Sequence, residues 1–285
     1  MQIYGFLFEV QNICRTFVSV FIVKAMRPIT DINELRALQM GILDYVHHYC
    51  MDHGLRYFLS CGTLIGAVRH GGYIPWDDDI DIYMPRADYD ELLQSFQDET
   101  GRYRILAPGI THPYYYTFAK VVDTRTRMVE RETQGYEIGV YMDIFPVDYV
   151  TDHLQERERV FRLKRLLFKI RRCKISHQNP LHSRLAYWCY RCLPVTVKQL
   201  DRLIDRVIHV GEPTHTVCNM TEAGPGIKGC LPAEDVVSMV DIGFEGRTYK
   251  TMVGYRDYLS RTYGDYMQLP PEDQRVTHQF EAYWL

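Results

Sequence analysis

Apolar residues at helical spacing define the first clear element of the chain. They share one face of residues 31–53 and comprise Leu35, Leu38, Ile42, Leu43 and Val46. Thr30 or Asp31 stands where a helix N-cap is expected, so this stretch predicts an amphipathic helix. Helical patterns also cover residues 86–96, 152–210 and 255–263.

Shorter apolar runs predict strands between these helices. They cover residues 56–60, 79–85, 118–123, 139–148 and 242–256, the last of them around Gly246. Such runs, bounded by turn residues, are typical of buried strands. The stretch 211–232 is rich in Gly and Pro, and we expect it to form loops over a site.

Strands and helices mixed in this order predict an α/β fold of the α+β type, with a small mixed sheet flanked by helices. The helical stretch reads as an insertion, broken at Asn179-Pro180 and at Pro194. The chain then divides into an N-terminal extension, a core, the insertion and a C-terminal part of the same unit. These are residues 1–25, 26–150, 151–215 and 216–285.

The N-terminal extension has an amphipathic pattern. Ile3, Phe6, Val10 and Phe17 belong to its apolar stripe, but Glu9 and other polar residues interrupt any run long enough to span a membrane. No basic region precedes the apolar part, as a secretory signal would require. Eight cysteines in 285 residues are too few for a disulfide scaffold. These features predict a cytoplasmic protein.

The insertion carries the strongest local charge. Residues 156–174 contain nine Arg and Lys against two Glu, a net charge of +7 in a chain whose net charge is −3. Apolar residues between them recur at helical spacing: Val160, Phe161, Leu163, Leu166, Leu167 and Ile170. Two interpretations stay open: a solvated helix packed on the core, or a helix that docks on an anionic membrane surface or glycan carrier.

Candidate chemistry lies in an acidic cluster of Asp77, Asp78, Asp79 and Asp81. On a strand, Asp79 and Asp81 project from the same face. Two carboxylates at that spacing repel each other unless a divalent metal or a proton neutralises them, and Mg²⁺ with phosphate oxygens is a common partner. The alternative is an idle, solvated acidic turn.

A small-residue turn upstream favours the functional interpretation. Gly62 and Thr63 follow a predicted strand and open a predicted helix. Gly62 allows close approach of an anion to the backbone, Thr63 offers a hydroxyl and an N-cap, and the helix N-terminus supplies free N–H groups. Together with the Asp pair, this turn predicts a phosphate-handling enzyme.

The two motifs have a long and specific likeness to a known family. They read Gly62-Thr63-Leu64-Ile65-Gly66-Ala67-Val68-Arg69-His70 and Tyr73-Ile74-Pro75-Trp76-Asp77-Asp78-Asp79-Ile80-Asp81. With Met84-Pro85-Arg86, residues 120–126, 139–148 and 263–272, this pattern resembles the LicD family of phosphorylcholine transferases, within the nucleotidyltransferase superfamily. The likeness covers most of residues 30–285 and implies a nucleotidyltransferase-like core.

The resemblance implies a role for each matched position. Asp79 and Asp81 would bind Mg²⁺, or Mn²⁺, and Gly62 and Thr63 would hold the substrate phosphates. Asp143 would be the third carboxylate, as a second metal ligand or the base for the acceptor hydroxyl.

Alternatives stay open at several of these positions. Asp143 could cap a turn, and Asp148 competes with it, although a structural role suits Asp148 better. Lys120 and Arg69 are the candidate cations for the phosphates. Both could equally be surface charges, and Arg69 could cap its helix or pair with Asp78.

The implied reaction is the Mg²⁺-dependent transfer of phosphocholine, or a similar phospho-alcohol, from a CDP-activated donor to a hydroxyl of a cell-surface glycan. The glycan would be of the lipopolysaccharide, teichoic acid or capsule type. Tyr114, Tyr115 and Tyr116 are candidates for a cation–π choline pocket. Peripheral contact with the inner face of the cell membrane, through residues 1–25 or 156–174, would suit a lipid-linked acceptor.

Other function classes use the same residues. A nucleotidyltransferase would instead attach NMP to a sugar or other small acceptor. A non-catalytic metal- or membrane-binding module is the second alternative, but an EF-hand is excluded because Ile82 stands where that loop requires Gly. Nucleic acid is not an expected partner, because no reading motif accompanies the basic helix.

Overall fold

The computed structural model describes eight parts of the chain. They are residues 26–112, 114–129, 138–176, 181, 183–209, 212–221, 226–275 and 281–285. The amphipathic extension, residues 1–25, lies outside the described residues.

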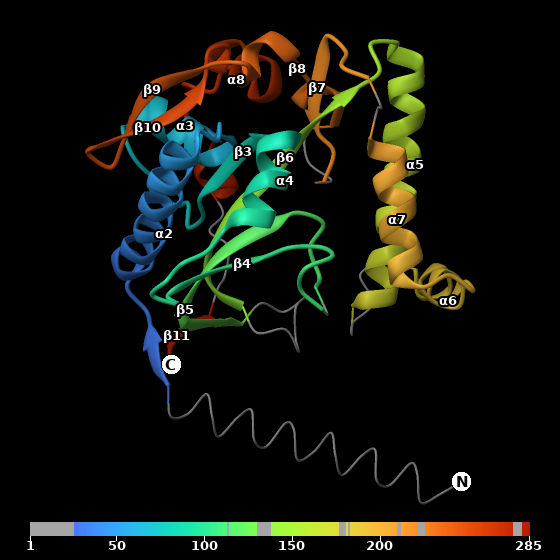
Figure 1. The fold of residues 1–285 in the computed structure, drawn as a ribbon, viewed down its shortest axis with the longest axis horizontal. Coiled ribbons are helices and arrows are strands. Elements are labelled where there is room, and N and C mark those ends of the chain that lie inside the picture. Colours follow the sequence, from blue (N-terminus) through green and yellow to red (C-terminus); the bar gives the residue numbers. More distant parts are fainter. Residues whose placement is uncertain are drawn as a thin grey trace, which may run out of the picture.

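A mixed sheet forms the centre of the molecule, which confirms the α/β class (Figure 1). Its nine strands include six in the order β1-β11-β5-β6-β3-β2, with β4 beside β5, and β7 between β6 and β8. Their bounds are β1 Arg27–Ile29, β2 Phe58–Leu59, β3 Asp81–Pro85, β4 Tyr103–Leu106, β5 Ala119–Val129, β6 Ile138–Val150, β7 Thr216–Asn219, β8 Leu231–Pro232 and β11 Glu281–Trp284. β3 and β6 are parallel, whereas β5 is antiparallel to β6.

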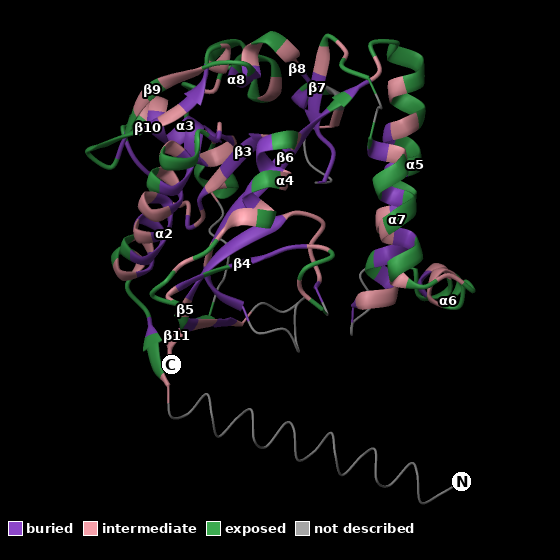
Figure 2. Ribbon diagram, viewed as in Figure 1, coloured by how far each residue is buried: buried purple, intermediate pink, exposed green. Residues whose placement is uncertain are grey.

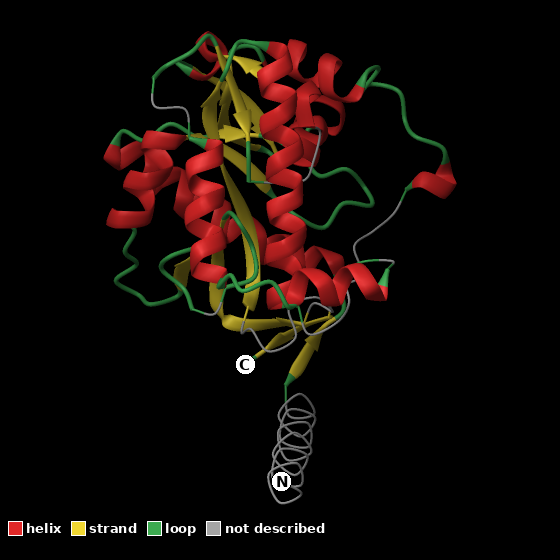
Figure 3. Ribbon diagram, turned by 90° about the vertical axis from the view of Figure 1, so that its right-hand side faces the viewer, coloured by secondary structure: helices red, strands yellow, loops and turns green. Residues whose placement is uncertain are grey.

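Helices cover the sheet (Figure 3). They are α2 Ile32–His53, α3 Cys61–His70, α4 Arg86–Ser95, α5 Leu154–Ile175, α6 Arg184–Arg191, α7 Val197–Ile208 and α8 Tyr255–Tyr263. Short 3₁₀ turns are η2 Gly226–Gly229, η3 Ala233–Val236 and η4 Glu272–Gln274. A separate antiparallel hairpin joins β9 Met239–Phe244 to β10 Arg247–Met252.

Local sequence explains the start and the end of α2. The Asp31 carboxylate accepts a hydrogen bond from the Asn33 N–H, and Gly54 ends the helix at φ 68°. Both are standard helix signals, because Asp caps free N–H groups and Gly adopts the left-handed conformation easily. The predicted apolar face is buried in the main core, which confirms this helix.

The insertion has a hydrophobic core of its own. Buried residues of α5 and α7 pack together and against the end of β6 and β7, forming a second cluster (Figure 2). The prediction for the α5 stripe was only partly correct. Phe161, Leu167 and Ile170 are buried, but Leu163 and Leu166 are 45% and 42% exposed, whereas Lys164 is buried.

The region that follows α7 corrects a second expectation. Residues 211–232 were expected to be loops over the site, but β7 within them pairs with the end of β6, Thr216 lying opposite Val150. β7 therefore extends the sheet beside the insertion. The turn at Gly246 is confirmed, with φ 71° between β9 and β10.

None of the helices within the described ranges is long and apolar enough to cross a membrane.

Candidate active site

Three strands bring the predicted charged residues to one level of the sheet. Asp81, the first residue of β3, lies opposite Asp143 on the parallel strand β6. Asp143 in turn lies opposite Lys120 on β5. The sheet therefore brings together three of the residues that the sequence singled out.

Lys120 and Asp143 form a buried ion pair. The Lys120 Nζ lies 2.6 Å from Asp143 Oδ1, and Lys120 is only 1% exposed. The ammonium also lies 3.3 Å from the ring centroid of Tyr141 and 4.1 Å from that of Tyr116. Lys120 is thus no surface charge, and Asp143 does not act as a turn cap at a strand end.

The structure places Asp79 differently from the expectation. The strand begins at Asp81, so Asp79 belongs to the loop that precedes β3 and not to the strand itself. The alternation of a strand therefore does not fix the direction of Asp79. No group of three or more acidic, His or Cys side chains within the described ranges is arranged to hold a metal ion.

The Gly62-Thr63 turn packs directly against the acidic loop, residues 71–80 between α3 and β3. A Cβ added at Gly62 would lie 2.5 Å from Asp77 Oδ2, so a larger residue there would push this carboxylate aside. The Thr63 hydroxyl accepts a hydrogen bond of 2.9 Å from the Asp81 N–H. The prediction that Thr63 is the N-cap was wrong, because Ser60 has that position and Thr63 lies within the helix. Cys61, next to Gly62, has a left-handed backbone with φ 49°.

Two side chains of α2 hold the acidic loop, and no motif in the sequence pointed to them. Arg36 Nη2 donates to the carbonyls of Ile74 at 3.1 Å, Pro75 at 3.1 Å and Asp77 at 2.7 Å. Gln39 Nε2 donates to the carbonyl of Asp78 at 2.6 Å.

One sequence signal could have revealed this role. Gln39 interrupts the apolar face of α2 and is 1% exposed, and a buried amide requires hydrogen-bond partners. The tip of the β9–β10 hairpin holds the other end of the loop, since Glu245 Oε1 accepts the Tyr73 N–H at 2.9 Å.

Arg69 is engaged away from the carboxylates. Its Nη1 donates to the carbonyls of Tyr266 at 2.9 Å and Gln268 at 3.3 Å. Burial lowers the pKa of this guanidinium. The contact ties the end of α3 to the segment before η4. Arg275, which follows η4, has its Cζ 5.0 Å from the ring centroid of Trp76 in the acidic loop. The phosphate role of Arg69 stays a prediction.

Asp148 has a structural partner. Its two oxygens accept from Arg86 at 2.6 and 2.8 Å, and the carboxylate is 2% exposed. Although burial acts in the opposite direction, the hydrogen bond to Asp148 raises the pKa of Arg86. This fork joins α4 to β6 and agrees with the structural interpretation of Asp148.

The aromatic loop beside Lys120 is fastened to the insertion. Arg171 of α5 donates to the carbonyls of Tyr115 at 2.5 Å and Tyr114 at 3.2 Å, and its Nε pairs with Asp201 of α7. Of the three candidate choline tyrosines, Tyr116 is the one whose ring faces Lys120. The basic helix therefore helps to shape the neighbourhood of the carboxylates.

Known proteins share this sequence pattern. A family model described as "LicD/FKTN/FKRP, nucleotidyltransferase domain" matches residues 54–184. The lipopolysaccharide cholinephosphotransferase LicD of Haemophilus influenzae is 32% identical over 268 residues, 89% of this chain and 98% of that protein. The human and mouse ribitol 5-phosphate transferases FKRP are each 59% identical over 48 residues, 17% of this chain and 10% of theirs. The chain belongs to the LicD family.

Proposed function

We propose that this LicD-family transferase moves phosphocholine, or a similar phospho-alcohol, from a CDP-activated donor to a hydroxyl group of lipopolysaccharide. The printed names of the relatives support the reaction class. The Haemophilus relative is a cholinephosphotransferase of lipopolysaccharide, and the mammalian relatives transfer ribitol 5-phosphate, so both move a phosphorylated alcohol. The observation that carries the proposal is the row of Asp81, Asp143 and Lys120 across three strands.

The donor set suits a divalent cation. Asp81 and Asp143 lie opposite each other on neighbouring parallel strands, and Asp79 precedes Asp81 by two residues. Mg²⁺ is commonly bound by one or two carboxylates together with substrate phosphates, so Asp79 and Asp81 would hold it with the donor phosphates, and Asp143 would be either a further ligand or the base for the acceptor hydroxyl. When bound, the ion would neutralise the donor pyrophosphate and make CMP a better leaving group.

The chain's own groups have separate tasks in this proposal. Asp143 accepts the proton of the acceptor hydroxyl as that oxygen attacks the donor phosphorus. Lys120 fixes the orientation of Asp143 through the 2.6 Å hydrogen bond and places a positive charge beside the reacting phosphate. The first turn of α3 directs its N–H groups toward the pyrophosphate, the usual use of a helix N-terminus.

Transfer from a panel of CDP-activated alcohols tests this assignment. We expect wild-type protein with Mg²⁺ to release CMP from one donor and to label deacylated lipopolysaccharide with its head group. Asp79→Ala/Asp81→Ala should lose this activity by a factor of about 10³ or more. Asp52→Ala, an exposed carboxylate of α2, is the matched control and should keep full activity.

A different product would identify a different reaction. Metal-dependent pyrophosphate release from an NTP, with NMP left on the acceptor and no CMP from any CDP-alcohol, would identify a nucleotidyltransferase. Activity retained by the Asp79/Asp81 double variant would reject the proposed carboxylates.

We also propose that the protein meets its acceptor as a peripheral protein at the inner membrane face. The outward side of α5 supports this step. It exposes Arg159, Arg162, Arg165, Lys169 and Arg172 together with Leu163 and Leu166. A basic face with exposed apolar side chains suits an anionic lipid surface.

A further inference from the structure

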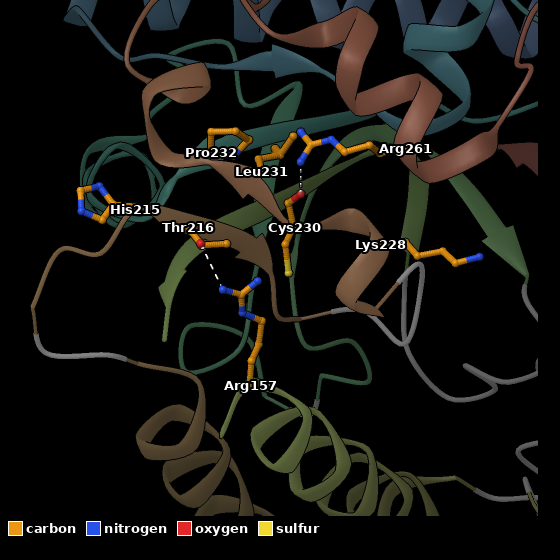
Figure 4. Close-up of a pocket in the computed structure, with 8 residues that line it drawn as sticks. All are labelled: Arg157, His215, Thr216, Lys228, Cys230, Leu231, Pro232 and Arg261. Carbon is orange, nitrogen blue, oxygen red and sulfur yellow. Dashed lines mark hydrogen bonds between the residues drawn. The ribbon is translucent and has the colours of Figure 1, made fainter. Parts of the chain in front are cut away.

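A cavity lies away from the candidate active site, between the insertion and the C-terminal part of the chain. It has a volume of about 440 Å³ and is lined by Arg157, His215, Thr216, Lys228, Cys230, Leu231, Pro232 and Arg261 (Figure 4). Three of these residues are permanent cations, contributed by α5, η2 and α8. None of the lining residues is Asp or Glu.

Two of the cations are held in place by neutral partners. Arg157 donates from Nε to the Thr151 carbonyl at 2.8 Å and from Nη2 to Thr216 Oγ1 at 3.1 Å. Arg261 donates to the Cys230 carbonyl at 3.3 Å. In Figure 4 these two arginines approach Cys230 from opposite sides. Fixed guanidinium groups bind phosphate or carboxylate with little loss of side-chain entropy.

The surrounding carboxylates offset this charge only in part. Asp235 lies 3.9 Å from Arg261, a long ion pair. The Asp152 carboxylate accepts hydrogen bonds from the main-chain N–H of His215 and from the Thr216 hydroxyl.

A thiol in the cavity wall responds to the same positive charge. The hydrogen bond from Cys218 is the largest cause that lowers the pKa of Cys230. Burial acts in the opposite direction, and the charges of Arg157 and Lys164 lower the pKa further. The Arg157 charge thus acts on this thiol as well, although the hydrogen bond from Cys218 has the larger effect.

The cavity is separate from the carboxylates but connected to them by one strand. Thr216 in its wall pairs with Val150 at the end of β6, and Asp143 lies seven residues earlier on that strand. A strand rises about 3.3 Å per residue, so the two places are roughly 23 Å apart. The donor's own phosphates therefore do not explain the cavity, whereas an extended oligosaccharide covers such a distance.

We propose that this cavity binds a phosphate group carried by a sugar of the acceptor glycan, at a distance from the hydroxyl that is modified. This site rests on the proposed function for the identity of the acceptor. The phosphate accepts hydrogen bonds from Arg157, Lys228 and Arg261 and orients the glycan along the protein surface. No bond is formed or broken there.

Calorimetric titration without donor or metal tests the site. The probes are deacylated lipopolysaccharide oligosaccharide and the same oligosaccharide after phosphatase treatment. Lys228→Gln/Arg261→Gln removes two cavity charges. The control Lys198→Gln/Arg104→Gln removes the same charge from exposed positions of α7 and β4 outside the lining, and thermal melting confirms that both variants fold.

We expect the phosphorylated probe to bind wild type and control equally, and the cavity variant about tenfold more weakly. The phosphatase-treated probe should bind all three weakly, and inorganic phosphate should compete with the phosphorylated probe. Equal affinity in wild type and cavity variant, equal loss in the control, or no competition by inorganic phosphate would overturn the site.

A parallel assay of CMP release separates the two proposals. Phosphate-dependent binding without CMP release would reject the proposed transfer reaction and keep the cavity as a phosphate site. Transfer to the oligosaccharide with binding that does not depend on its phosphate would reject the cavity alone.

Discussion

At the residue scale, Lys120 combines a structural role with the catalytic role proposed above. It is buried, bonded to Asp143 and packed over Tyr141. Lys120→Met should lower the free energy of unfolding by about 3 kcal/mol or more, because it removes a hydrogen-bonded cation from beside a buried carboxylate. Urea denaturation measures this loss.

The matched control for Lys120→Met is Lys169→Met, an exposed position of α5 that should change stability little. In Lys120→Met/Asp143→Asn the loss should be smaller than the sum of the two single losses, since the pair is one unit. A loss below about 1 kcal/mol for Lys120→Met would contradict the buried pair.

Substitutions at Gly62 and Gly66, both in α3, should affect activity and stability differently. Alanine at Gly62 meets the end of the Asp77 side chain, which can turn aside, whereas alanine at Gly66 would lie 2.4 Å from the main-chain carbonyl of Gly72. Gly62→Ala should therefore reduce CMP release about tenfold with little change in melting temperature. Gly66→Ala should cost about 1–3 kcal/mol of stability. The opposite ranking of the two variants would show that the acidic loop is placed differently.

The acidic loop, at the scale of elements, is positioned by α2. Arg36→Met removes the hydrogen bonds to its carbonyls but keeps an unbranched side chain. We expect CMP release to fall about 10²-fold, because a displacement of about 1 Å at a reacting centre has that effect. Amide hydrogen exchange over residues 74–79 should accelerate in the same variant.

Arg104→Met, an exposed position of β4, is the control for this experiment and should show neither effect. Unchanged exchange in Arg36→Met together with lost activity would mean that Arg36 contacts the substrate instead of positioning the loop.

The short helix α6 presents an apolar face to solvent. Leu185 is 76% exposed and Trp188 58% exposed, and Cys189 is also exposed. The helix is fixed to α5, because Arg191 donates to the carbonyls of Cys173 at 2.9 Å and Ser176 at 3.2 Å. We expect this face, together with the basic side of α5, to take part in the proposed membrane contact.

Co-sedimentation with vesicles checks that contact. Wild-type protein should bind vesicles with anionic lipid more than purely zwitterionic ones, and added salt should weaken the binding. Leu185→Ser/Trp188→Ser should reduce binding about tenfold through lost apolar burial. Leu203→Ser, at an exposed position of α7, is the comparison. Equal binding by wild type and the α6 variant would reject this surface.

At the scale of the whole molecule, the first and the last strands of the described residues pair in the sheet. β11 lies between β1 and β5, and the Trp284 Nε1–H donates to Glu34 Oε1 at 2.9 Å. Deleting residues 281–285 should lower the free energy of unfolding by about 2 kcal/mol or more, since buried Ala282 and most of the Trp284 ring lose their contacts. Chemical denaturation checks this, and a stability equal to that of the full chain would show that β11 adds nothing to the sheet.

Local patterns predicted most of the helices and the place of Gly62 and Thr63 at the start of one of them. α2 and the β9–β10 hairpin could be predicted because caps, apolar faces and turn glycines act over a few residues. β7 and β11 could not, because each is held by pairing with a strand far away in sequence.

The candidate site follows the same division. The acidic residues were visible in the sequence, but the alignment of Asp81 with Asp143 depends on the register of strands 62 residues apart. The roles of Arg36 and Gln39 depend on contacts across about 40 residues, which spacing alone does not reveal. Asp79 was assigned to a strand because alternation alone does not mark where a strand begins.

The way in which α2 holds the acidic loop has a consequence for redesign. Arg36 and Gln39 bind main-chain oxygens, which every residue type supplies. The path of the loop is therefore set through its main chain as well as through Tyr73 and the carboxylate near Gly62. Loop side chains that contact neither the core nor the proposed metal can be exchanged while the backbone frame stays the same, a suitable starting point for libraries that select new donor head groups.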